Sequence, residues 1–416
     1  MSALQKTIMK SKLPPRCPKS ASGKLAPFGM ARRKDYSPVP WQQYFEKYVD
    51  AETESGRFRV YLSPEPDHSS RPRLVTLHGG GYSGLSWALF TEEITNMIHC
   101  QVISMDIRGH GETQADNPDD LSADTLVKDV EQVLHKLFGD ELPPIVLVGH
   151  SMGGAVAVRA ALLPSLEPYV HGIAVIDVVE GTAMDALASM QSFLRGRPTH
   201  FRSIEHAVEW CVRSGQVRNV DSAKVSMPSQ ILNCETNLLA TNELATHTPE
   251  SPHAPAPMSL PPAADCIAEE PEDADADDHA DADADMNADA DFAPPPIALP
   301  TRGDGDTNMR YKWRIDLSKT ERYWSGWFQG LSARFLSVRA PRLLLLASIE
   351  GLDRELTIGQ MQGKFQMQVL TRCGHAVHED TPGEVARVIA AFLLRHRVTE
   401  ATEAGEDMQL ASTPGC

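Results

Sequence analysis

A single serine lies between glycines where one apolar segment ends and another begins. The pentapeptide GHSMG (149–153) overlaps the end of the aliphatic run PIVLVGH and precedes the alanine-rich AVAVRAALL. A G-x-S-x-G sequence between a strand and a helix is typical of a sharp turn that exposes a nucleophilic serine, and its small residues let the strand and the helix approach closely. A serine that only caps the helix is the alternative. The strand–turn–helix setting favours Ser151 as a nucleophile.

A nucleophilic serine requires hydrogen-bond donors for the negative charge that develops on the carbonyl oxygen of its substrate. In this arrangement one donor is the backbone N–H of the residue after the nucleophile, which is Met152 here. A second glycine-rich segment, HGGG (78–81), follows the apolar run RLVTL. Glycines leave backbone N–H groups unobstructed by a Cβ atom. We therefore predict the second donor in the region of Gly80 and Gly81, rather than a plain glycine turn.

The general base of such a site is expected on a loop near the end of the fold. The segment CGHAVHEDTP (373–382) follows the last apolar run and precedes the helical pattern GEVARVIAAFLLRH. We predict that His375 is the base. His378 is the alternative, but it falls within the next turn, where a histidine more readily caps or packs. The HAVHE spacing matches neither HExxH nor HxxEH, so it does not indicate a zinc site.

The acidic partner of the base has two candidate positions. Asp177 lies at the end of the run GIAVIDVV, whereas Glu350 and Asp353 follow the later run RLLLLAS. Most folds of this type use the later position, whereas Asp177 lies at the carboxyl end of its strand, where active-site groups of open α/β sheets gather. Spacing alone therefore leaves Asp177 and the later acids open.

Short apolar runs alternate with helical patterns along much of the chain. After Ser122, a possible cap, apolar residues recur at helical spacing: Leu126, Val130, Val133, Leu134 and Leu137. Several of the apolar runs are almost continuous aliphatics, which is typical of parallel strands covered on both faces. We predict an α/β fold with a mostly parallel central sheet flanked by helices. The runs are FRVYLS, RLVTLHGG, CQVISMDI, PIVLVGH, GIAVIDVV, RLLLLAS and FQMQVL.

The alternation fails between about residues 180 and 340. Helical stretches there are interrupted by a tract of Pro, Ala, Asp and Thr that includes DADADDHADADADMNADAD. A tract with so few large apolar side chains cannot offset the entropy of ordering, so we predict a disordered insert; metal binding by its carboxylates is the less favoured alternative. We divide the chain into a disordered basic arm (1–40), the first part of an α/β core (41–179), a helical cap (180–235), the acidic insert (236–307), the second part of the cap (308–338), the second part of the core (339–398) and a tail (399–416).

The net charge of −17 belongs mostly to the insert, because Glu243 to Asp306 contains 17 acidic residues and one basic residue. The charge therefore says little about the partners of the folded part. No span is apolar and long enough to cross a bilayer, and no apolar segment follows the basic N-terminus. The seven cysteines include no CxxC pair, which favours reduced thiols. We expect a cytoplasmic or nuclear protein with neither membrane nor nucleic acid as a partner, and without a metal or cofactor.

Six segments are long and specific, unlike the pentapeptide around Ser151: DYSPVPWQQYFE, HGGGYSGLSWALFT, IDVVEGTAMDAL, SFLRGRP, LTIGQMQGKFQMQVL and CGHAVHED. Together they resemble the eukaryotic protein phosphatase methylesterases. The resemblance implies an α/β-hydrolase that demethylates the carboxymethylated C-terminal leucine of the type 2A protein phosphatase catalytic subunit, bound together with its scaffold subunit. It implies a triad of Ser151, Asp177 and His375, and it implies that the phosphatase helps to order these groups.

Two other functions remain open at this point. A broad carboxylesterase or lipase would need a long apolar groove, whereas the predicted cap mixes tryptophans with basic residues. We expect these aromatic side chains to pack against the substrate leucine or against neighbouring rings, and the basic ones to meet an acidic partner surface. A phosphatase-binding inhibitor with secondary hydrolase activity is the other alternative. The cap residues in question are Trp313, Trp324, Trp327, Arg314, Lys319 and Arg322.

Overall fold

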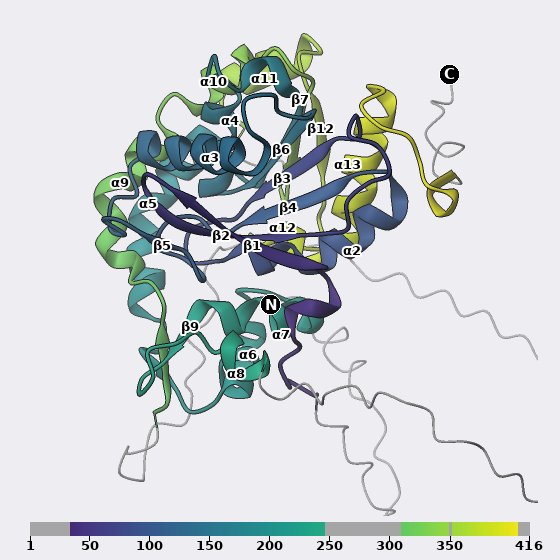
Figure 1. Ribbon diagram of the computed structural model, residues 1–416. Helices are drawn as coiled ribbons and strands as arrows, with labels where there is room; N and C mark the ends of the chain where they lie inside the picture. The colour runs from purple at the N-terminus through teal and green to yellow at the C-terminus, as the bar shows by residue number, and fades with distance from the viewer. Residues whose placement is uncertain (1–33, 246–308, 349–351, 407–416) are drawn as a thin grey trace, which may run out of the picture. The chain divides into compact units, whose positions relative to one another are not determined.

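A central sheet runs through the part of the chain that the computed structural model describes, which comprises residues 34–245, 309–348 and 352–406. Its strands follow the order β1 (Lys47–Thr53), β2 (Gly56–Leu62), β4 (Gln101–Met105), β3 (Arg73–Leu77), β6 (Ile145–His150), β7 (Val170–Ile176), β11 (Arg342–Leu346) and β12 (Gln366–Val369). A further short strand, β5 (Gln114–Ala115), pairs with β2 (Figure 1).

The sheet is mostly parallel, as predicted. The strands β4, β3, β6, β7, β11 and β12 pair in parallel, and only β1 and β5 against β2, and β2 against β4, are antiparallel within the described sheet. Each of the seven apolar runs overlaps one of these strands. The edge strand β1 was not predicted, because KYVDAET buries only Ala51 and so lacks an apolar run.

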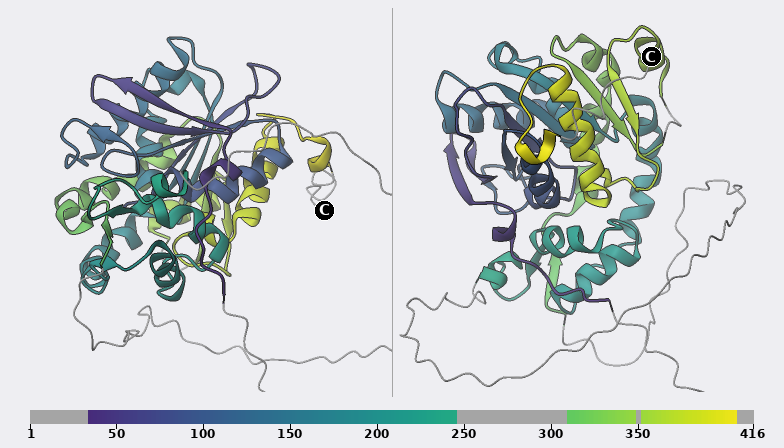
Figure 2. Two further views of the ribbon diagram at one scale, coloured as in Figure 1. Left: turned by 60° about the horizontal axis from the view of Figure 1, so that its bottom comes forward. Right: turned by 90° about the vertical axis from the view of Figure 1, so that its right-hand side faces the viewer.

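Side chains alternate between the two faces of the sheet, and helices cover both faces. In β6, Ile145 and Leu147 belong to one buried cluster, whereas Val146 and Val148 belong to the other. Each fully buried aliphatic side chain of this kind contributes about 1.5–3 kcal/mol. The face with Ile145 and Leu147 is covered by α3 (Ala123–Phe138), α4 (Met152–Ala160) and α11 (Arg354–Met361). The face with Val146 and Val148 is covered by α2 (Ala88–Met97), α12 (Val377–Asp380) and α13 (Pro382–Arg395). On this second face α2 packs against α13 (Figure 2).

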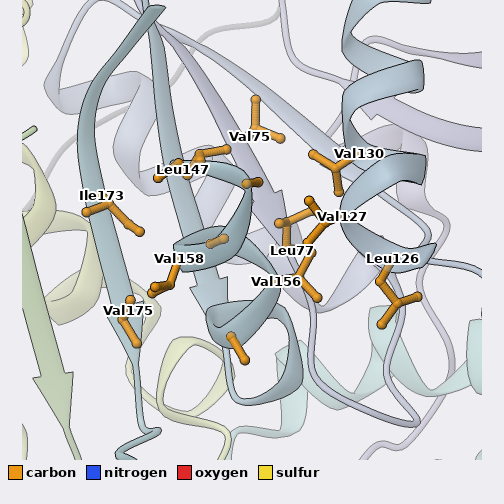
Figure 3. Packing of buried hydrophobic residues seen from close by; sticks show 14 of the residues in the cluster. Val75, Leu77, Leu126, Val127, Val130, Leu147, Val156, Val158, Ile173 and Val175 are labelled. Carbon is orange, nitrogen blue, oxygen red and sulfur yellow. The ribbon is translucent and has the colours of Figure 1, made fainter. Parts of the chain in front are cut away.

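Helix α3 confirms the helical spacing read from the sequence. Leu126, Val130, Val133 and Leu134 are buried, and Leu137 packs at the edge of the same cluster. Ser122 precedes the helix, but its hydroxyl accepts no N–H from the first turn. Figure 3 shows this helix and α4 against the strands, through Leu126, Val127, Val130, Val156, Val158, Val75, Leu77, Leu147, Ile173 and Val175.

The cap contains a small sheet that the helical prediction did not include. Its central strand β10 (Tyr311–Trp313) follows the insert in sequence and pairs with β8 (His200–Phe201) and β9 (Ile231–Asn233), which precede it. The segments on the two sides of the insert are thus joined. The cap helices are α5 (Glu180–Arg195), α6 (Ile204–Arg213), α7 (Val220–Ser226), α8 (Thr241–Ala245), α9 (Glu321–Phe328) and α10 (Leu331–Ser337).

The two predicted disordered segments fall largely outside the described residues. Of the insert, only 236–245 is described, and there Ala240 is buried and α8 forms, so these residues continue the cap. Of the basic arm, only 34–40 is described; Tyr36 packs at the edge of the cap cluster, and the N–H of Val39 donates to the Lys224 carbonyl over 3.1 Å. Residues 246–307 and 1–33 lie outside the described residues.

The cap tryptophans stabilise the protein itself. Trp324 and Trp327 are buried, and their indole N–H groups donate to Thr320 Oγ1 and to the Leu121 carbonyl. Trp313 donates to the Pro198 carbonyl, and the Arg197 guanidinium lies 3.5 Å from its ring centroid. Of the two expected roles, contact with the substrate leucine does not fit Trp324 and Trp327, because both are buried; Trp327 instead packs against the neighbouring ring of Phe328, with ring centroids 6.0 Å apart.

Close backbone packing at the start of α4 generates a stability prediction. A Cβ atom at Gly153 would lie 2.2 Å from the carbonyl oxygen of Leu77 in β3. Because a backbone carbonyl cannot move aside as a flexible side chain can, we expect Gly153→Ala to lower the free energy of unfolding by at least about 3 kcal/mol in urea denaturation.

Gly326 provides the matched control. It lies in α9, it is exposed, and no atom lies within 4 Å of the position that a Cβ would take there. Alanine at an exposed helix position is favoured over glycine, so Gly326→Ala should raise stability by about 0.5–1 kcal/mol. Equal effects of the two substitutions would contradict the packing described for Gly153.

Candidate active site

Ser151 lies at the tight turn between β6 and α4. Its φ of 52° and ψ of −120° place a non-glycine residue in an unfavourable region of backbone space, at a cost on the order of 1–3 kcal/mol. Its N–H donates to the Ile176 carbonyl of β7 over 3.0 Å. The small residues beside it are also required, because a Cβ at Gly149 would lie 2.3 Å from the Gly153 carbonyl oxygen. The geometry is that of the predicted elbow.

Asp177 and His375 meet at the carboxyl end of the sheet. His375 Nδ1 donates to Asp177 Oδ2 over 2.7 Å, and the other carboxylate oxygen accepts the N–H of Ala347 over 2.9 Å. Burial alone raises the pKa of Asp177, but these hydrogen bonds outweigh it, so the pKa lies below its ordinary value. The carboxylate is ionised at neutral pH and fixes the proton of His375 on Nδ1. The Nε2 atom is left free to accept a proton.

The competing sequence candidates occupy other environments. Asp353 begins α11, where it accepts the N–H of Leu356 over 2.9 Å and contacts the Ser332 hydroxyl. Glu350 lies outside the described residues. His378 is fully buried, with its ring 4.2 Å from that of Trp87, and burial lowers its pKa to about 3. Of the alternatives that the sequence left open, only Asp177 and His375 are joined by a hydrogen bond in the described chain.

The link between nucleophile and base is open. Within the described residues, no hydrogen bond joins Ser151 Oγ to His375 Nε2, although the ring of the preceding residue, His150, lies 4.7 Å from that of His375. Nucleophile–base hydrogen bonds are often long before substrate is bound and tighten in the complex. The hydrogen bond between the predicted acid and base is therefore formed, whereas the one between nucleophile and base is not.

The two predicted oxyanion donors differ in availability. Met152 is the first residue of α4, so its N–H has no intrahelical carbonyl partner. The N–H of Gly81, which has a φ of 84°, already donates to His110 Nε2 over 2.9 Å. The Gly81 N–H is therefore engaged within the protein, and the N–H of Gly80 stays the predicted second donor. Its loop lies beside the nucleophile, since a Cβ at Gly79 would be 3.3 Å from that of Ser151.

Two histidines and an aspartate, none of them singled out in the sequence, hold this loop against the segment 106–113. His78 Nε2 accepts the N–H of Ile107 over 3.0 Å, and Asp106 accepts the N–H of Gly84 over 2.7 Å. Burial lowers the pKa of His78 and His110, the latter to about 4, so both rings remain neutral acceptors. The available signal was DIRGHG (106–111), a polar sequence directly after an apolar run.

This arrangement can perform covalent catalysis on a carboxylic ester. It combines a strained, half-buried serine, an exposed imidazole oriented by a carboxylate, and backbone donors beside both. In the described part of the chain, no three His, Cys, Asp or Glu side chains are grouped so as to hold a metal ion. None of the helices described there is both long and apolar enough to cross a membrane.

A family model and individual related proteins both match this chain over most of its length. Residues 74–388 match the model of the alpha/beta hydrolase family. Protein phosphatase methylesterase 1 of Homo sapiens is 50% identical over 409 residues, covering 96% of this chain and 97% of the human protein. The protein of the same name from Neurospora crassa is 35% identical over 408 residues, covering 89% of this chain and 78% of its own length.

Solved structures at low identity agree on the fold. E-2-(acetamidomethylene)succinate hydrolase has a TM-score of 0.53 at 15% identity, with 83% of this chain and 98% of that chain covered. An esterase of M. tuberculosis has a TM-score of 0.51 at 16% identity, with 83% of this chain and 91% of that chain covered. These similarities concern the arrangement of the sheet and helices.

Burial of His378 generates a prediction for the pH dependence of stability. Because its pKa of about 3 lies below the usual 6.5, the unfolded chain binds a proton that the folded protein does not bind. The free energy of unfolding therefore carries no penalty from His378 above pH 6.5, and it falls as the pH decreases from 6.5 towards 3. Neither ring nitrogen has a hydrogen-bond partner among the described residues. Phenylalanine would keep the contact with Trp87 and remove the proton-binding group.

We expect wild type to lose about 2 kcal/mol more unfolding free energy between pH 7 and pH 5 than His378→Phe does. Urea denaturation at the two pH values measures the difference. At pH 7 the variant should be at least as stable as wild type, because an unpartnered buried polar group has been removed. An unchanged pH dependence would contradict the assigned burial of His378.

Proposed function

From the membership of this chain in the protein phosphatase methylesterases, within the alpha/beta hydrolase family, we propose that it removes the methyl group from a carboxymethylated C-terminal leucine of the type 2A protein phosphatase catalytic subunit. The observation that carries the proposal is the 2.7 Å hydrogen bond between His375 and Asp177, beside the elbow of Ser151. It supports ester hydrolysis by a serine nucleophile, and the identity to the relatives supports the choice of substrate.

The reaction would proceed in two steps through these residues. Ser151 Oγ attacks the ester carbonyl while His375 Nε2 takes its proton, and Asp177 stabilises the resulting imidazolium. The N–H groups of Met152 and Gly80 receive the negative charge on the carbonyl oxygen. As the C–O bond breaks, His375 returns the proton to the departing methoxide, and methanol leaves. Water, activated by the same imidazole, then attacks the acyl-enzyme and releases the leucine carboxylate.

Selectivity must come from the acyl side, because a methyl leaving group offers almost no contact area. The cap residue Leu317 supports this, since its side chain lies over the oxyanion loop, 3.7 Å from a Cβ placed at Gly80. It is a candidate contact for the substrate leucine. Lys319, whose ammonium group lies 4.0 Å from the exposed carboxylate of Asp316, and Arg322 are both exposed on the same part of the cap and can meet an acidic partner surface. Remote contacts of this kind can orient the carbonyl over the serine.

Docking of a large partner would also account for the open Ser151–His375 link. We propose that contacts with the phosphatase catalytic subunit, with its scaffold subunit bound, bring the two side chains into hydrogen-bond distance. Binding energy from surfaces far from the ester would then appear in the rate of the chemical step. The proposed cellular setting is cytoplasmic, nuclear or both.

The test compares three substrates at equal, sub-saturating concentration: methylated phosphatase core enzyme, a methylated tail peptide and free leucine methyl ester. We expect kcat/KM for the phosphatase to exceed that for the free ester by at least ~10³, equivalent to about 4 kcal/mol of differential binding. Part of the gain should appear in kcat, because docking completes the catalytic geometry. Methanol release gives the rates.

Ser151→Ala is the control for both parts of the proposal. It should abolish hydrolysis of all three substrates while leaving phosphatase binding intact, since only the hydroxyl is removed. Equal efficiency on the three substrates would make the protein a broad carboxylesterase. If the wild-type protein hydrolysed none of the three substrates but still bound and inhibited the phosphatase, it would instead be a binding inhibitor.

A further inference from the structure

His375, the proposed base, lies on a short loop between β12 and α12. The position of its ring therefore depends on the position of the main chain of this loop. Asp177 holds the ring at Nδ1. Rotation and translation of the loop would still move Nε2 relative to Ser151. Two hydrogen bonds to the main chain on either side of the His375 Cα atom restrict this motion, and neither partner belongs to the proposed triad.

The first bond comes from His150, the residue directly before the nucleophile. His150 is fully buried at the end of β6, and its Nε2 lies 2.8 Å from the carbonyl oxygen of His375. Because a carbonyl only accepts, Nε2 carries the proton. His150 therefore holds the main chain of the predicted base, His375. Because His150 is bonded to Ser151 in the chain, this hydrogen bond links the loop of the base to the turn that carries the nucleophile.

The surroundings of His150 keep it neutral and fixed. The centroid of its ring lies 4.5 Å from that of His378, 4.7 Å from that of His375 and 5.6 Å from that of Tyr82. A Cβ at Gly79 would lie 2.8 Å from Nδ1, so only glycine leaves room for the imidazole. Burial, together with the nearby His378 and His375, lowers the pKa of His150 well below its ordinary value. A ring held in this way donates over the whole physiological pH range.

The second bond comes from Asp380, at the end of α12. Asp380 Oδ2 accepts the N–H of Gly374 over 2.6 Å, and Oδ1 accepts the N–H of Arg218, also over 2.6 Å. Arg218 closely precedes the cap helix α7, whose Ser222 hydroxyl donates to the Glu379 carbonyl over 2.7 Å. The Asp380 side chain is 1% exposed, so water does not compete for these bonds. The base loop is thus tied to the cap as well as to the elbow.

We propose that His150 and Asp380 are positioning residues that hold the main chain on either side of His375 and so set the approach of its Nε2 to Ser151. The inference rests on the proposed role of His375 as general base, but not on the identity of the ester. A displacement of about 1 Å between reacting groups can cost on the order of 10² in rate, which gives the size of the effect to expect.

The decisive pair of substitutions is His150→Leu and His150→Gln in the full-length chain. Glutamine can present an amide N–H at the reach of Nε2, whereas leucine fills the space without a donor. Hydrolysis of p-nitrophenyl acetate and of methylated phosphatase core enzyme should be measured for each, together with the melting temperature. We expect His150→Leu to lower kcat by at least ~30-fold on both substrates with little change in KM, and His150→Gln to retain kcat within about fivefold.

A purely structural role would lower the melting temperature of both variants without a rescue of kcat by glutamine. That result, or a kcat for His150→Leu within about threefold of wild type, overturns the proposal. Because hydrolysis of the synthetic ester depends on the catalytic groups and not on contacts with the phosphatase, loss of kcat there supports the proposal even if the phosphatase is not the substrate. Failure of the proposed function would instead appear in wild type, as hydrolysis of the synthetic ester without hydrolysis of methylated phosphatase.

Asp380→Asn addresses the second bond and replaces the test should His150→Leu not fold. An amide can accept only one of the two N–H groups and presents its own NH₂ to the other, so we expect about a tenfold or greater loss of kcat with KM unchanged. Asp353→Asn is the matched control, since that carboxylate accepts a backbone N–H at the start of α11 and contacts no residue of the base loop in the described chain. Equal kcat values for the two variants overturn the role of Asp380.

Discussion

The hydrogen bond between Asp177 and His375 joins residues 198 positions apart, and the catalytic arrangement depends on it. It can form because β6, β7, β11 and β12 are consecutive parallel strands of the sheet, so that the loops after them, including the loop after β12 that carries His375, open at the same edge. Ser151 follows β6, Asp177 follows β7, and the N–H of Ala347, which follows β11, donates to the same carboxylate. The order of the strands therefore brings nucleophile, acid and base together from distant parts of the sequence.

The sheet also supplies the rigidity that an unfavourable backbone requires. Ser151 and Asp177 both have positive φ angles, at 52° and 50°, and each is held by a backbone hydrogen bond to the neighbouring strand. Backbone strain of this kind persists only where the surrounding structure enforces it. Buried aliphatic layers on both faces of β6 and β7, and the backbone contact between Gly153 and β3, provide that enforcement. The packing of the core thus holds Ser151 in the strained turn that presents its hydroxyl group.

Local patterns in the sequence were sufficient for the fold class, for the turn at Ser151 and for placing His375 on the loop before the last helices, because each depends on neighbouring residues. The choice between Asp177 and Asp353 was not local, since it depends on which strand end the base loop contacts. The small cap sheet was missed for a similar reason: β10 pairs with strands on the other side of a long insert. The roles of His110 and Trp324 depend on burial and on hydrogen bonds to distant segments, which no spacing encodes.

Hydrolysis through an ester of Ser151 is tested most directly by nucleophile partitioning. An acyl-enzyme can be captured by hydroxylamine in place of water, which yields a hydroxamate at the C-terminal leucine and regenerates the serine. With the full-length chain and methylated phosphatase, we predict hydroxamate in proportion to hydroxylamine, one methanol for each product, and neither product with Ser151→Ala. Methanol release with carboxylate as the only enzyme-dependent product would mean that water attacks the ester directly, and it would contradict the serine mechanism.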